Sequence, residues 1–441
     1  MSNSVEIKKK IGIFKKTINV PGDKSLSIRW VLFASLAKGK SKAKNLLMSE
    51  DVIAAIKAVK KLGIKVIIKE RECTIFGKGI GGYNYKKNLT INAQNSGTLG
   101  RLILGLLVNS TKPINLIGDK SLSKRDFYRI TKPLKKFGVK FYSSHKRLPI
   151  IMKGSKNPKS INYQEKKGSA QCKTSIMLAA LKSSGTTKIK AKKSRNHTEL
   201  LFKHLKLPIT IKKTKQYDLI TVKGVNNVRS INYNIPGDIS SCAFFIVLTI
   251  LSKNSKLLIK NININPTRIG VVKILKKMNA SIKIINKKNY KGELIGDIIV
   301  ESSKNLKAIN CPIKYNTSAI DEFLIIFLVA SKAKGISYFK KISELNKKES
   351  PRLKIASKIL NKIGIKTKLR SDSIKIYGNP NIKLSKKILI KNFMKDHRVF
   401  MMSTIAALSF GGEWKIYNKS CINTSFPSFI KIAKKLGAKI N

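Results

Sequence analysis

Cysteine and histidine are both scarce in this chain, with 5 and 4 residues among 441. The cysteines stand singly at positions 73, 172, 242, 311 and 421, and no C-x-x-C pair occurs. This spacing argues against a disulfide framework or a zinc ribbon and favours a reducing compartment, so we expect a cytoplasmic protein. With so few histidines, no metal site is expected either.

Long hydrophobic runs are also lacking. The longest, Cys242–Leu248 and Phe323–Ala330, are far shorter than the ~20 apolar residues of a membrane-spanning helix. The N-terminal residues carry lysines but no apolar signal-peptide core, so neither secretion nor a membrane partner is expected. Hydrophobic residues nevertheless make up 42% of the chain, enough to bury sizeable cores in two or three domains.

Acidic residues are the third scarcity, because 22 Asp and Glu stand against 91 Lys and Arg, for a net charge of +69. Such a charge would suit a nucleic-acid binder or a protein with anionic substrates. The basic residues, however, are 79 lysines and only 12 arginines, spread evenly along a chain rich in Ile and Asn. This pattern indicates drift in an AT-rich genome as the main cause of a basic protein. An arginine in such a chain then indicates a position that needs a planar, forked guanidinium.

A short phrase recurs six times at the ends of amphipathic helices, as in KKLGIKV at 60–66. Its marker residues lie at positions 63, 138, 208, 279, 364 and 437, which gives a repeat of roughly 73 residues. A second helix in each repeat is apolar nearly all round and should be buried. The copies of this helix begin near Lys24, Ser96, Ser169, Asp238, Asp321 and Asp396. Each repeat therefore predicts a strand, a buried helix, a strand, a surface helix and further strand structure, in an α/β fold.

Two Pro-Gly breaks share a signature, VPGD at 20–23 and IPGD at 235–238. A Pro-Gly pair is often a simple turn, but these two lie before the first repeat and between the third and fourth. We interpret them as the two strands of a hinge between two domains of three repeats. The predicted domain I contains residues 1–20 and 238–441, and domain II contains residues 23–235.

Polar and basic residues cluster at the starts of the predicted buried helices. Lys24 and Arg29 lie in the first, Asp321 begins the fifth and Arg398 lies in the sixth. Each alone could be a helix cap or a solvated side chain. Together, however, these starts and the loops between repeats hold six of the twelve arginines, and helix N-termini favour anions. If three starts face one way in each domain, two domains would enclose a cleft for polyanionic small molecules.

Ten motifs appear in order along the chain. They are PGDKSLSIR (21–29), NSGTLGR (95–101), GDKSLSKR (118–125), GSAQCKTS (168–175), SRNHTE (194–199), PGDISSCAFF (236–245), NPTR (265–268), IDE (320–322), ELNKKESPR (344–352) and DHR (396–398). Together they resemble the 3-phosphoshikimate 1-carboxyvinyltransferase family, also called EPSP synthases, over the whole chain. The resemblance implies two inside-out α/β domains, each of three βαβαββ units around a pseudo-threefold axis, with the active site in the interdomain cleft.

The resemblance also implies the reaction. The enolpyruvyl group of phosphoenolpyruvate would be transferred to the 5-hydroxyl of shikimate 3-phosphate, with release of phosphate, in the shikimate pathway of aromatic amino acid biosynthesis. This chemistry needs an acid/base pair and several fixed cations, but no metal or organic cofactor. The two substrates are then the expected partners, and the expected oligomeric state is a monomer.

The site residues that the resemblance implies fall into three groups. The implied ligands of shikimate 3-phosphate are Lys24, Ser25, Arg29, Ser169, Gln171, Arg195, Asp321 and Lys348. The implied ligands of phosphoenolpyruvate are Lys24, Gly97, Arg125, Gln171, Arg352 and Arg398. Asp321 would be the base on the 5-hydroxyl, and Glu349 and Lys24 would carry protons at the enolpyruvyl carbon. Without the resemblance, Asp321 could equally be a helix cap and Glu349 a surface ion pair.

Three positions depart from the family pattern. Pro351 replaces the usual Asp and Asn346 the usual Arg, which puts the hydrogen-bond support around Arg352 in doubt. Thr424 stands where some members carry a phosphoenolpyruvate-binding lysine, so one anion contact is expected to be missing or supplied elsewhere. Gly97 resembles glyphosate-sensitive members, so the chain is an expected glyphosate target whose sensitivity Thr424 leaves open.

Two alternative functions are weighed against this one. The sister enzyme that adds enolpyruvate to UDP-N-acetylglucosamine would share the fold, but it usually relies on a reactive cysteine in a mobile loop. Here that loop reads IGDKSLSKRD (117–126), with Arg125 and no cysteine. A nonenzymatic polyanion- or nucleic-acid-binding protein should show a basic patch interleaved with aromatics. Aromatic residues make up only 7% of the chain and form no such patch, so no specific nucleic-acid partner is expected.

Overall fold

The computed structural model describes residues 3–70, 72–142 and 146–441. Strands and helices alternate along the chain, so the predicted α/β class is confirmed. The chain forms two compact units. Unit 1 comprises residues 1–21, 236–290 and 294–441, and unit 2 comprises residues 22–235 and 291–293.

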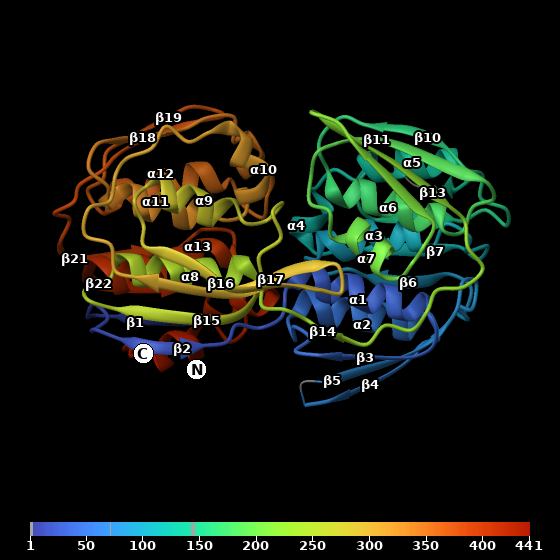
Figure 1. The fold of residues 1–441 in the computed structure, drawn as a ribbon, viewed down its shortest axis with the longest axis horizontal. Coiled ribbons are helices and arrows are strands. Elements are labelled where there is room, and N and C mark those ends of the chain that lie inside the picture. The colour runs from blue at the N-terminus through green and yellow to red at the C-terminus, as the bar shows by residue number, and fades with distance from the viewer. Residues whose placement is uncertain (1–2, 71, 143–145) are drawn as a thin grey trace. The chain divides into compact units, whose positions relative to one another are not determined.

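Unit 2 contains three four-stranded sheets among its described residues (Figure 1). The first has the order β14 (Tyr233–Asn234), β3 (Lys38–Lys44), β5 (Glu72–Lys78), β4 (Lys65–Lys69), with helices α1 (Lys24–Leu36) and α2 (Glu50–Lys61). The second has the order β6 (Leu89–Asn92), β7 (Ile114–Ile117), β9 (Ile150–Lys153), β8 (Lys140–Phe141), with α3 (Gly97–Leu106), α4 (Lys120–Ser123) and α5 (Tyr128–Lys136). The third has the order β10 (Asn162–Glu165), β11 (Thr186–Lys192), β13 (Tyr217–Lys223), β12 (Ile209–Lys213), with α6 (Ala170–Ala180) and α7 (His197–His204).

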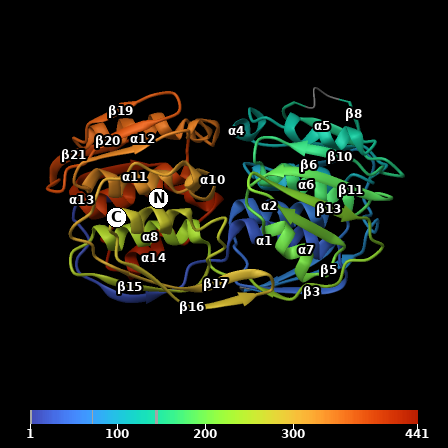
Figure 2. The ribbon, with the colours of Figure 1, turned by 45° about the horizontal axis from the view of Figure 1, so that its top comes forward.

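Unit 1 likewise contains three sheets among its described residues (Figure 2). The first has the order β16 (Ile282–Tyr290), β17 (Glu293–Glu301), β15 (Lys256–Asn263), β2 (Lys15–Ile18), with α8 (Ile239–Leu251) and α9 (Gly270–Lys277). The second has the order β18 (Ile336–Phe339), β20 (Ile374–Tyr377), β19 (Thr367–Leu369), with α10 (Asn316–Ala319), α11 (Phe323–Lys332) and α12 (Arg352–Lys362). The third has the order β1 (Ser4–Ile7), β22 (Gly411–Tyr417), β21 (Leu384–Ile390), with α13 (His397–Phe410) and α14 (Phe429–Lys435).

The repeats share a parallel crossover. In five sheets one pair of neighbouring strands runs parallel: β14 with β3, β2 with β15, β6 with β7, β10 with β11 and β21 with β22. In the last three of these pairs a single buried helix joins the two strands (α3, α6 and α13), as expected because parallel neighbours need a long connection. The six repeats read from the sequence are therefore present in the structure.

The buried helices form the centre of each unit. Every residue of α8 and of α13 is buried, and α8, α11 and α13 pack against one another in unit 1. In unit 2, α3 packs against both α1 and α6. A helix that is apolar on all sides has no face to offer to water, so these helices lie inside while their polar starts remain at one end.

In two repeats, one strand of the sheet comes from a distant part of the sequence. β2 pairs in parallel with β15 at Lys15–Lys256, and β14 pairs in parallel with β3 at Tyr233–Ala43. The Pro-Gly segments follow directly after these two strands. Gly22 must be glycine there, because a Cβ would lie 2.2 Å from the carbonyl oxygen of Asn45.

Candidate active site

Four predicted site residues meet in unit 1 at the starts of α11 and α12. Lys348 follows the short 3₁₀ helix Ser343–Lys347, and its Nζ donates to Asp321 Oδ1 at 3.0 Å. Arg352 begins α12, and its Nη1 lies 3.7 Å from the same oxygen. Glu349 Oε2 accepts from Arg352 Nη2 at 2.5 Å. One face therefore combines two carboxylates with two cations, a set able to move protons beside an anion.

Arg352 is held by a carboxylate to which the sequence analysis gave no role. Asp396 Oδ2 accepts from Nε at 2.8 Å and Oδ1 from Nη2 at 3.2 Å. Burial by itself lowers the pKa of Arg352, but the charges of Asp396 and Glu349 outweigh it and raise that pKa above its usual value. Burial likewise raises the pKa of Asp396, yet the charge of Arg352 wins and the pKa is lowered overall. Both groups therefore stay ionised.

Asp396 also answers the doubt raised by Pro351 and Asn346. Ser350 Oγ donates to Asp396 Oδ2 at 2.8 Å, beside the bond from Arg352. Pro351 is the N-cap residue of α12, and Asn346 Oδ1 accepts from the backbone N of Leu353 at 3.2 Å. The Arg352 side chain is thus held by Asp396, whose Oδ2 also accepts from Ser350, without a contribution from the side chain of Pro351 or Asn346.

Arg398 lies on the first turn of α13, two residues after Asp396. Its backbone N donates to Asp396 Oδ1 at 2.9 Å, and its Nη1 donates to the backbone oxygen of Asp321 at 2.8 Å. The same carboxylate therefore caps the helix of one candidate anion-binding arginine and holds the other. Thr424 Oγ1 lies 3.2 Å from His397 Nδ1 and donates to the carbonyl of Cys421.

In unit 2, Lys24 opens α1 and pairs with an acid that the motif analysis did not select. Its Nζ donates to Asp51 Oδ2 at 2.8 Å, and the Asp51 side chain is only 9% exposed. Asp51 lies in the first turn of α2. The signal that could have found it is the scarcity of acids, since a buried carboxylate in this chain requires a partner.

Arg29 is buried on α1 and held by neutral groups. Nε donates to Thr198 Oγ1 at 2.9 Å, Nη1 to the carbonyl of Ser25 at 3.0 Å and Nη2 to Thr174 Oγ1 at 3.3 Å. Burial lowers the pKa of Arg29 to about 10, which still leaves it charged at neutral pH. The positive charge of Arg195 also lowers this pKa, so the two guanidiniums lie within electrostatic range.

The starts of α3 and α6 bring a second group together in unit 2. Gln171 Oε1 accepts from Arg101 Nη1 at 2.6 Å, and its Nε2 donates to Thr98 Oγ1 at 3.1 Å. A Cβ at Gly97 would lie 3.2 Å from Arg101 Nη1 and 3.3 Å from Arg125 Nη1, so the glycine leaves room for both arginines. Ser169 is the N-cap of α6 and accepts from the backbone N of Cys172.

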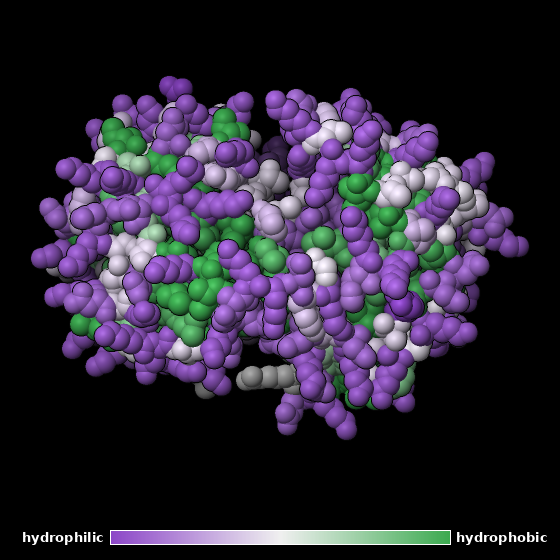
Figure 3. Space-filling model, viewed as in Figure 1, coloured by the Kyte–Doolittle hydropathy of each residue, from purple (hydrophilic) through white to green (hydrophobic). Residues whose placement is uncertain are grey.

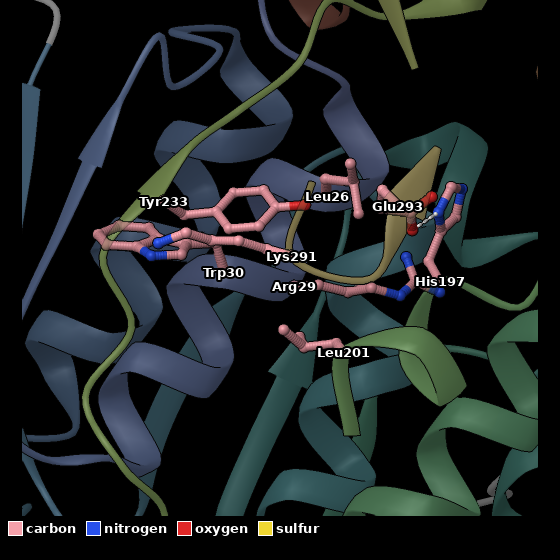
Figure 4. A pocket seen from close by; sticks show the side chains of 8 residues that line it. All are labelled: Leu26, Arg29, Trp30, His197, Leu201, Tyr233, Lys291 and Glu293. Atoms are coloured by element: carbon pink, nitrogen blue, oxygen red, sulfur yellow. Dashed lines mark hydrogen bonds and ion pairs between the residues drawn. The ribbon is translucent and has the colours of Figure 1, made fainter. Parts of the chain in front are cut away.

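The first turn of α7, just after Arg195, is fixed at three consecutive buried residues. His197 Nδ1 lies 2.6 Å from Glu293 Oε1, Thr198 holds Arg29, and Glu199 pairs with buried Lys173. Figure 4 shows His197 and Glu293 beside Arg29 in a small pocket also lined by Leu26, Trp30, Leu201, Tyr233 and Lys291. Glu293 is the first residue of β17, and it belongs to unit 2 together with residues 291–292 of the turn before it.

The cysteines offer no reactive thiol. All five are buried and free, and burial raises the pKa of Cys172, the one nearest to these residues, to about 12. This disfavours the cysteine-dependent alternative. Within residues 3–70, 72–142 and 146–441, no group of three or more His, Cys, Asp or Glu side chains could hold a metal ion. Across these ranges no helix has the length and apolar character to span a bilayer.

On the face shown in Figure 3, hydrophilic side chains predominate, and apolar side chains gather in a few patches between them. Lysines occur on every sheet, for example Lys42, Lys188 and Lys375. This distribution agrees with a compositional origin of the charge and contrasts with the site arginines, which are buried or half-buried.

A family model described as EPSP synthase (3-phosphoshikimate 1-carboxyvinyltransferase) matches residues 8–432. The 3-phosphoshikimate 1-carboxyvinyltransferase of Petrotoga mobilis is 37% identical over 424 residues, covering 95% of this chain and 96% of that protein. The protein of the same name from Ruthia magnifica is 37% identical over 426 residues, covering 96% of each.

Solved structures agree. EPSP synthase from Acinetobacter baumannii superposes with a TM-score of 0.87 at 31% identity, covering 99% of both chains. The enolpyruvyl transferase NikO from Streptomyces tendae has a TM-score of 0.78 at 13% identity, which shows a shared fold.

Proposed function

The chain belongs to the 3-phosphoshikimate 1-carboxyvinyltransferase (EPSP synthase) family, and we propose that the residues described above carry out the family's reaction. The enzyme transfers the enolpyruvyl group of phosphoenolpyruvate to the 5-hydroxyl of shikimate 3-phosphate and releases phosphate, in the shikimate pathway. The observation that carries the residue assignment is the meeting of Asp321, Lys348, Glu349 and Arg352 in unit 1.

Phosphoenolpyruvate is a small polyanion, so it needs fixed cations. Arg352 and Arg398 supply them from unit 1. Asp396 orients the guanidinium of Arg352, and the backbone oxygen of Asp321 accepts a hydrogen bond from that of Arg398. Lys24, Gly97, Arg125 and Gln171 are its proposed ligands from unit 2. A guanidinium whose direction is already set loses less entropy on binding and can stabilise charge that develops during the reaction.

Shikimate 3-phosphate is assigned mainly to unit 2. Its proposed ligands are Lys24, Ser25, Arg29, Ser169, Gln171 and Arg195, with Asp321 and Lys348 from unit 1. The buried hydrogen bonds of Arg29 to Thr174 and Thr198 support a rigid phosphate-binding group there.

The chemistry requires three proton movements. Asp321 takes the proton of the 5-hydroxyl as its oxygen attacks C2 of phosphoenolpyruvate, while Glu349 or Lys24 delivers a proton to C3. The resulting tetrahedral intermediate then loses a proton from the methyl carbon and expels phosphate, which regenerates the enol ether. The contact of Lys348 with Asp321 supports the role of that carboxylate as a base, because the cation favours the ionised form. Arg352 beside Glu349 supports proton delivery, because the cation stabilises the carboxylate left when the proton has gone to C3.

The finer organisation is proposed on the same basis. The predicted domains, residues 1–20 with 238–441 and residues 23–235, would move about hinges near 20–23 and 235–238, and the matched Pro-Gly segments support this. A cytoplasmic location is supported by five free, buried thiols. A monomer remains the proposed state, and the chain is proposed to be a glyphosate target.

The deciding experiment is a phosphate-release assay with both substrates. We expect phosphate only when shikimate 3-phosphate and phosphoenolpyruvate are both present, and inhibition by glyphosate in competition with phosphoenolpyruvate. UDP-N-acetylglucosamine should not replace shikimate 3-phosphate. Release with phosphoenolpyruvate and the nucleotide sugar, but not with phosphoenolpyruvate and shikimate 3-phosphate, would favour the sister activity. Binding of nucleic acid without any turnover would favour the nonenzymatic alternative. Retention on a polyanion column would not discriminate, because a net charge of +69 binds any polyanion.

A further inference from the structure

A buried chain of polar side chains in unit 1 leads toward Arg398 from residues with no role in the proposed chemistry. Arg268 lies in the NPTR segment between β15 and α9 and is 2% exposed, and Glu322 is 1% exposed. Ser240, on the first turn of α8, links the two. Its hydroxyl accepts a hydrogen bond from Arg268 Nη2 at 2.7 Å and donates to Glu322 Oε1.

At one end of this row of polar side chains, Asp238, the N-cap residue of α8, fixes Ser240 and Arg268. Asp238 Oδ1 accepts from the backbone N of Ser240 at 2.8 Å and from Arg268 Nη2 at 3.1 Å. The position of the Ser240 hydroxyl is therefore set by the helix and by the guanidinium at once. It can turn little without giving up one of these bonds.

At the other end of this row of polar side chains, Glu322 lies beside the proposed anion-binding residue Arg398. Glu322 Oε1 lies 3.8 Å from Arg398 Nη1, and the same nitrogen donates to the backbone oxygen of Asp321 at 2.8 Å. The adjacent residues Asp321 and Glu322 thus both contact Nη1 of this guanidinium. An arginine carries five N–H donors in one planar group. Contacts at Nη1 therefore fix the orientation of the guanidinium and leave its other donors available for a ligand.

The burial of these groups needs a reason. Two acids, Asp238 and Glu322, and two arginines, Arg268 and Arg398, are each at most 9% exposed. Buried ion pairs often add little net stability over apolar residues of similar volume, but they can fix a geometry. Glu322 adjoins Asp321, so the anchored acid also borders the proposed base.

We propose that Glu322, held by Ser240 and Arg268, is a positioning residue that aims Arg398 at phosphoenolpyruvate. The inference rests on the proposed role of Arg398 as a ligand of that substrate. A misplacement of about 1 Å can cost as much as 10²-fold in rate. Loosening this chain should therefore raise the KM for phosphoenolpyruvate by about 10-fold, with a smaller effect on kcat and none on the binding of shikimate 3-phosphate.

Two variants test the proposal at different points. Glu322→Gln removes the charge beside Arg398, and Ser240→Ala removes the hydroxyl that connects Glu322 to Arg268. The matched control is Ser403→Ala, because Ser403 is a buried serine of unit 1 whose hydroxyl donates to the carbonyl of Val399 in its own helix. Steady-state kinetics for each substrate, calorimetric binding of shikimate 3-phosphate and the melting temperature are measured for all three.

The expected result is a raised KM for phosphoenolpyruvate in Glu322→Gln and Ser240→Ala, with unchanged affinity for shikimate 3-phosphate and a near-normal KM in Ser403→Ala. If Glu322→Gln does not fold, Ser240→Ala decides alone. A KM within twofold of wild type, or an equal loss for both substrates, would overturn the proposal. Arg398→Lys distinguishes failure of this inference from failure of the proposed function. If it impairs the use of phosphoenolpyruvate while Glu322→Gln and Ser240→Ala do not, only the positioning role is wrong. If Arg398→Lys has no effect, the proposed role of Arg398 is wrong, and this inference is wrong with it.

Discussion

Asp396 binds Arg352 through both of its carboxylate oxygens, at 2.8 Å from Nε and 3.2 Å from Nη2. The arrangement is a two-point match of one planar group to another, which lysine cannot make. Since the Arg352 side chain is 1% exposed and that of Asp396 is 0% exposed, water takes little part in this pair. Several expected outcomes depend on it and on its neighbours.

Replacing Asp396 by Asn should destabilise the protein strongly. The substitution keeps the shape but leaves the Arg352 charge without its main partner, which costs about 3–5 kcal/mol when the pair is buried. Urea denaturation at neutral pH measures the loss. Glu6→Gln is the control, since Glu6 pairs with Lys415 at 2.9 Å on the surface and its loss should leave the midpoint unchanged. Equal midpoints for Asp396→Asn and wild type would contradict the argument.

The same comparison has a pH dependence with a definite sign. The pKa of Asp396 is lowered in the folded protein, so its contribution is complete above the ordinary Asp value of about 3.9. The contribution is lost as the pH falls through the folded value. The gap in stability between wild type and Asp396→Asn should therefore narrow only below about pH 4.

Replacing Arg398 by Lys should impair the use of phosphoenolpyruvate although the charge is kept. Lysine cannot contact the Asp321 carbonyl and a bound anion with one rigid fork. Loss of one charge-assisted bond costs about 1.5–3 kcal/mol, or roughly ten- to a hundredfold in kcat/KM. Initial rates at varied phosphoenolpyruvate give this ratio directly. Wild-type kinetics in Arg398→Lys would contradict the inference that an arginine in this lysine-rich chain indicates a position that needs a planar guanidinium.

Replacing Glu349 by Gln separates a chemical role from a structural one. Gln keeps the size and can still accept from Arg352, but it cannot carry a proton. If Glu349 transfers protons at C3, kcat should fall by about 10²–10⁴-fold while shikimate 3-phosphate still binds. Phosphate release and isothermal titration are the two measurements. Turnover close to the wild-type rate would leave Lys24 as the proposed proton carrier at that carbon.

Lys182 gives a prediction about stability in unit 2. It follows α6 and donates to the carbonyl of Leu106 at 2.6 Å and to Asn109 Oδ1 at 2.9 Å. Burial lowers its pKa to about 7, far below that of an unfolded lysine. Between these two values the unfolded chain binds more protons than the folded one, so stability should rise with pH above 7.

The check compares wild type with Lys182→Met from pH 7 to pH 9. The melting temperature of wild type should rise relative to that of the variant across this range, because the methionine of the variant has no group that titrates. Parallel curves would show that Lys182 titrates as an ordinary lysine.

A fifth prediction concerns the two units. The ligands proposed for phosphoenolpyruvate are Lys24 and Arg125 in unit 2 and Arg352 and Arg398 in unit 1. Simultaneous binding by all four should favour a more closed form of the molecule, which would exclude water from the reaction. Small-angle scattering should show a smaller radius of gyration with shikimate 3-phosphate and glyphosate together. An unchanged radius with confirmed binding would count against the hinge.

Local patterns in the sequence predicted the starts of the buried helices well. Asp23, Ser96, Ser169, Asp238 and Asp396 all cap helices whose starts were expected there, because a short polar side chain before an apolar run has few other uses. Asp321 is the exception. The helix begins at Phe323, and the Asp321 carboxylate accepts from Lys348 instead of capping it. The capping alternative for this residue is therefore wrong.

Partners far apart in the sequence could not be predicted in this way. Asp51 for Lys24, Asp396 for Arg352 and Glu322 for Arg398 are joined only by the fold, across separations of 27, 44 and 76 residues. No periodicity or motif spacing encodes such a pair. The composition could indicate only that scarce acids in a basic chain would find cations, not which ones.

The pairing of the first strands has a consequence for the order of synthesis. β1 pairs with β22 at Ser4–Tyr417, and β2 pairs with β15, whereas residues 22–235 of unit 2 form an unbroken stretch. Unit 2 can therefore begin to fold on the ribosome while the N-terminal strands wait. At about 5–20 residues per second, β1 waits on the order of 20–80 s for its partner to emerge. During that time its backbone edge is open to other chains, so unit 1 is the part of the molecule whose maturation a chaperone would most affect.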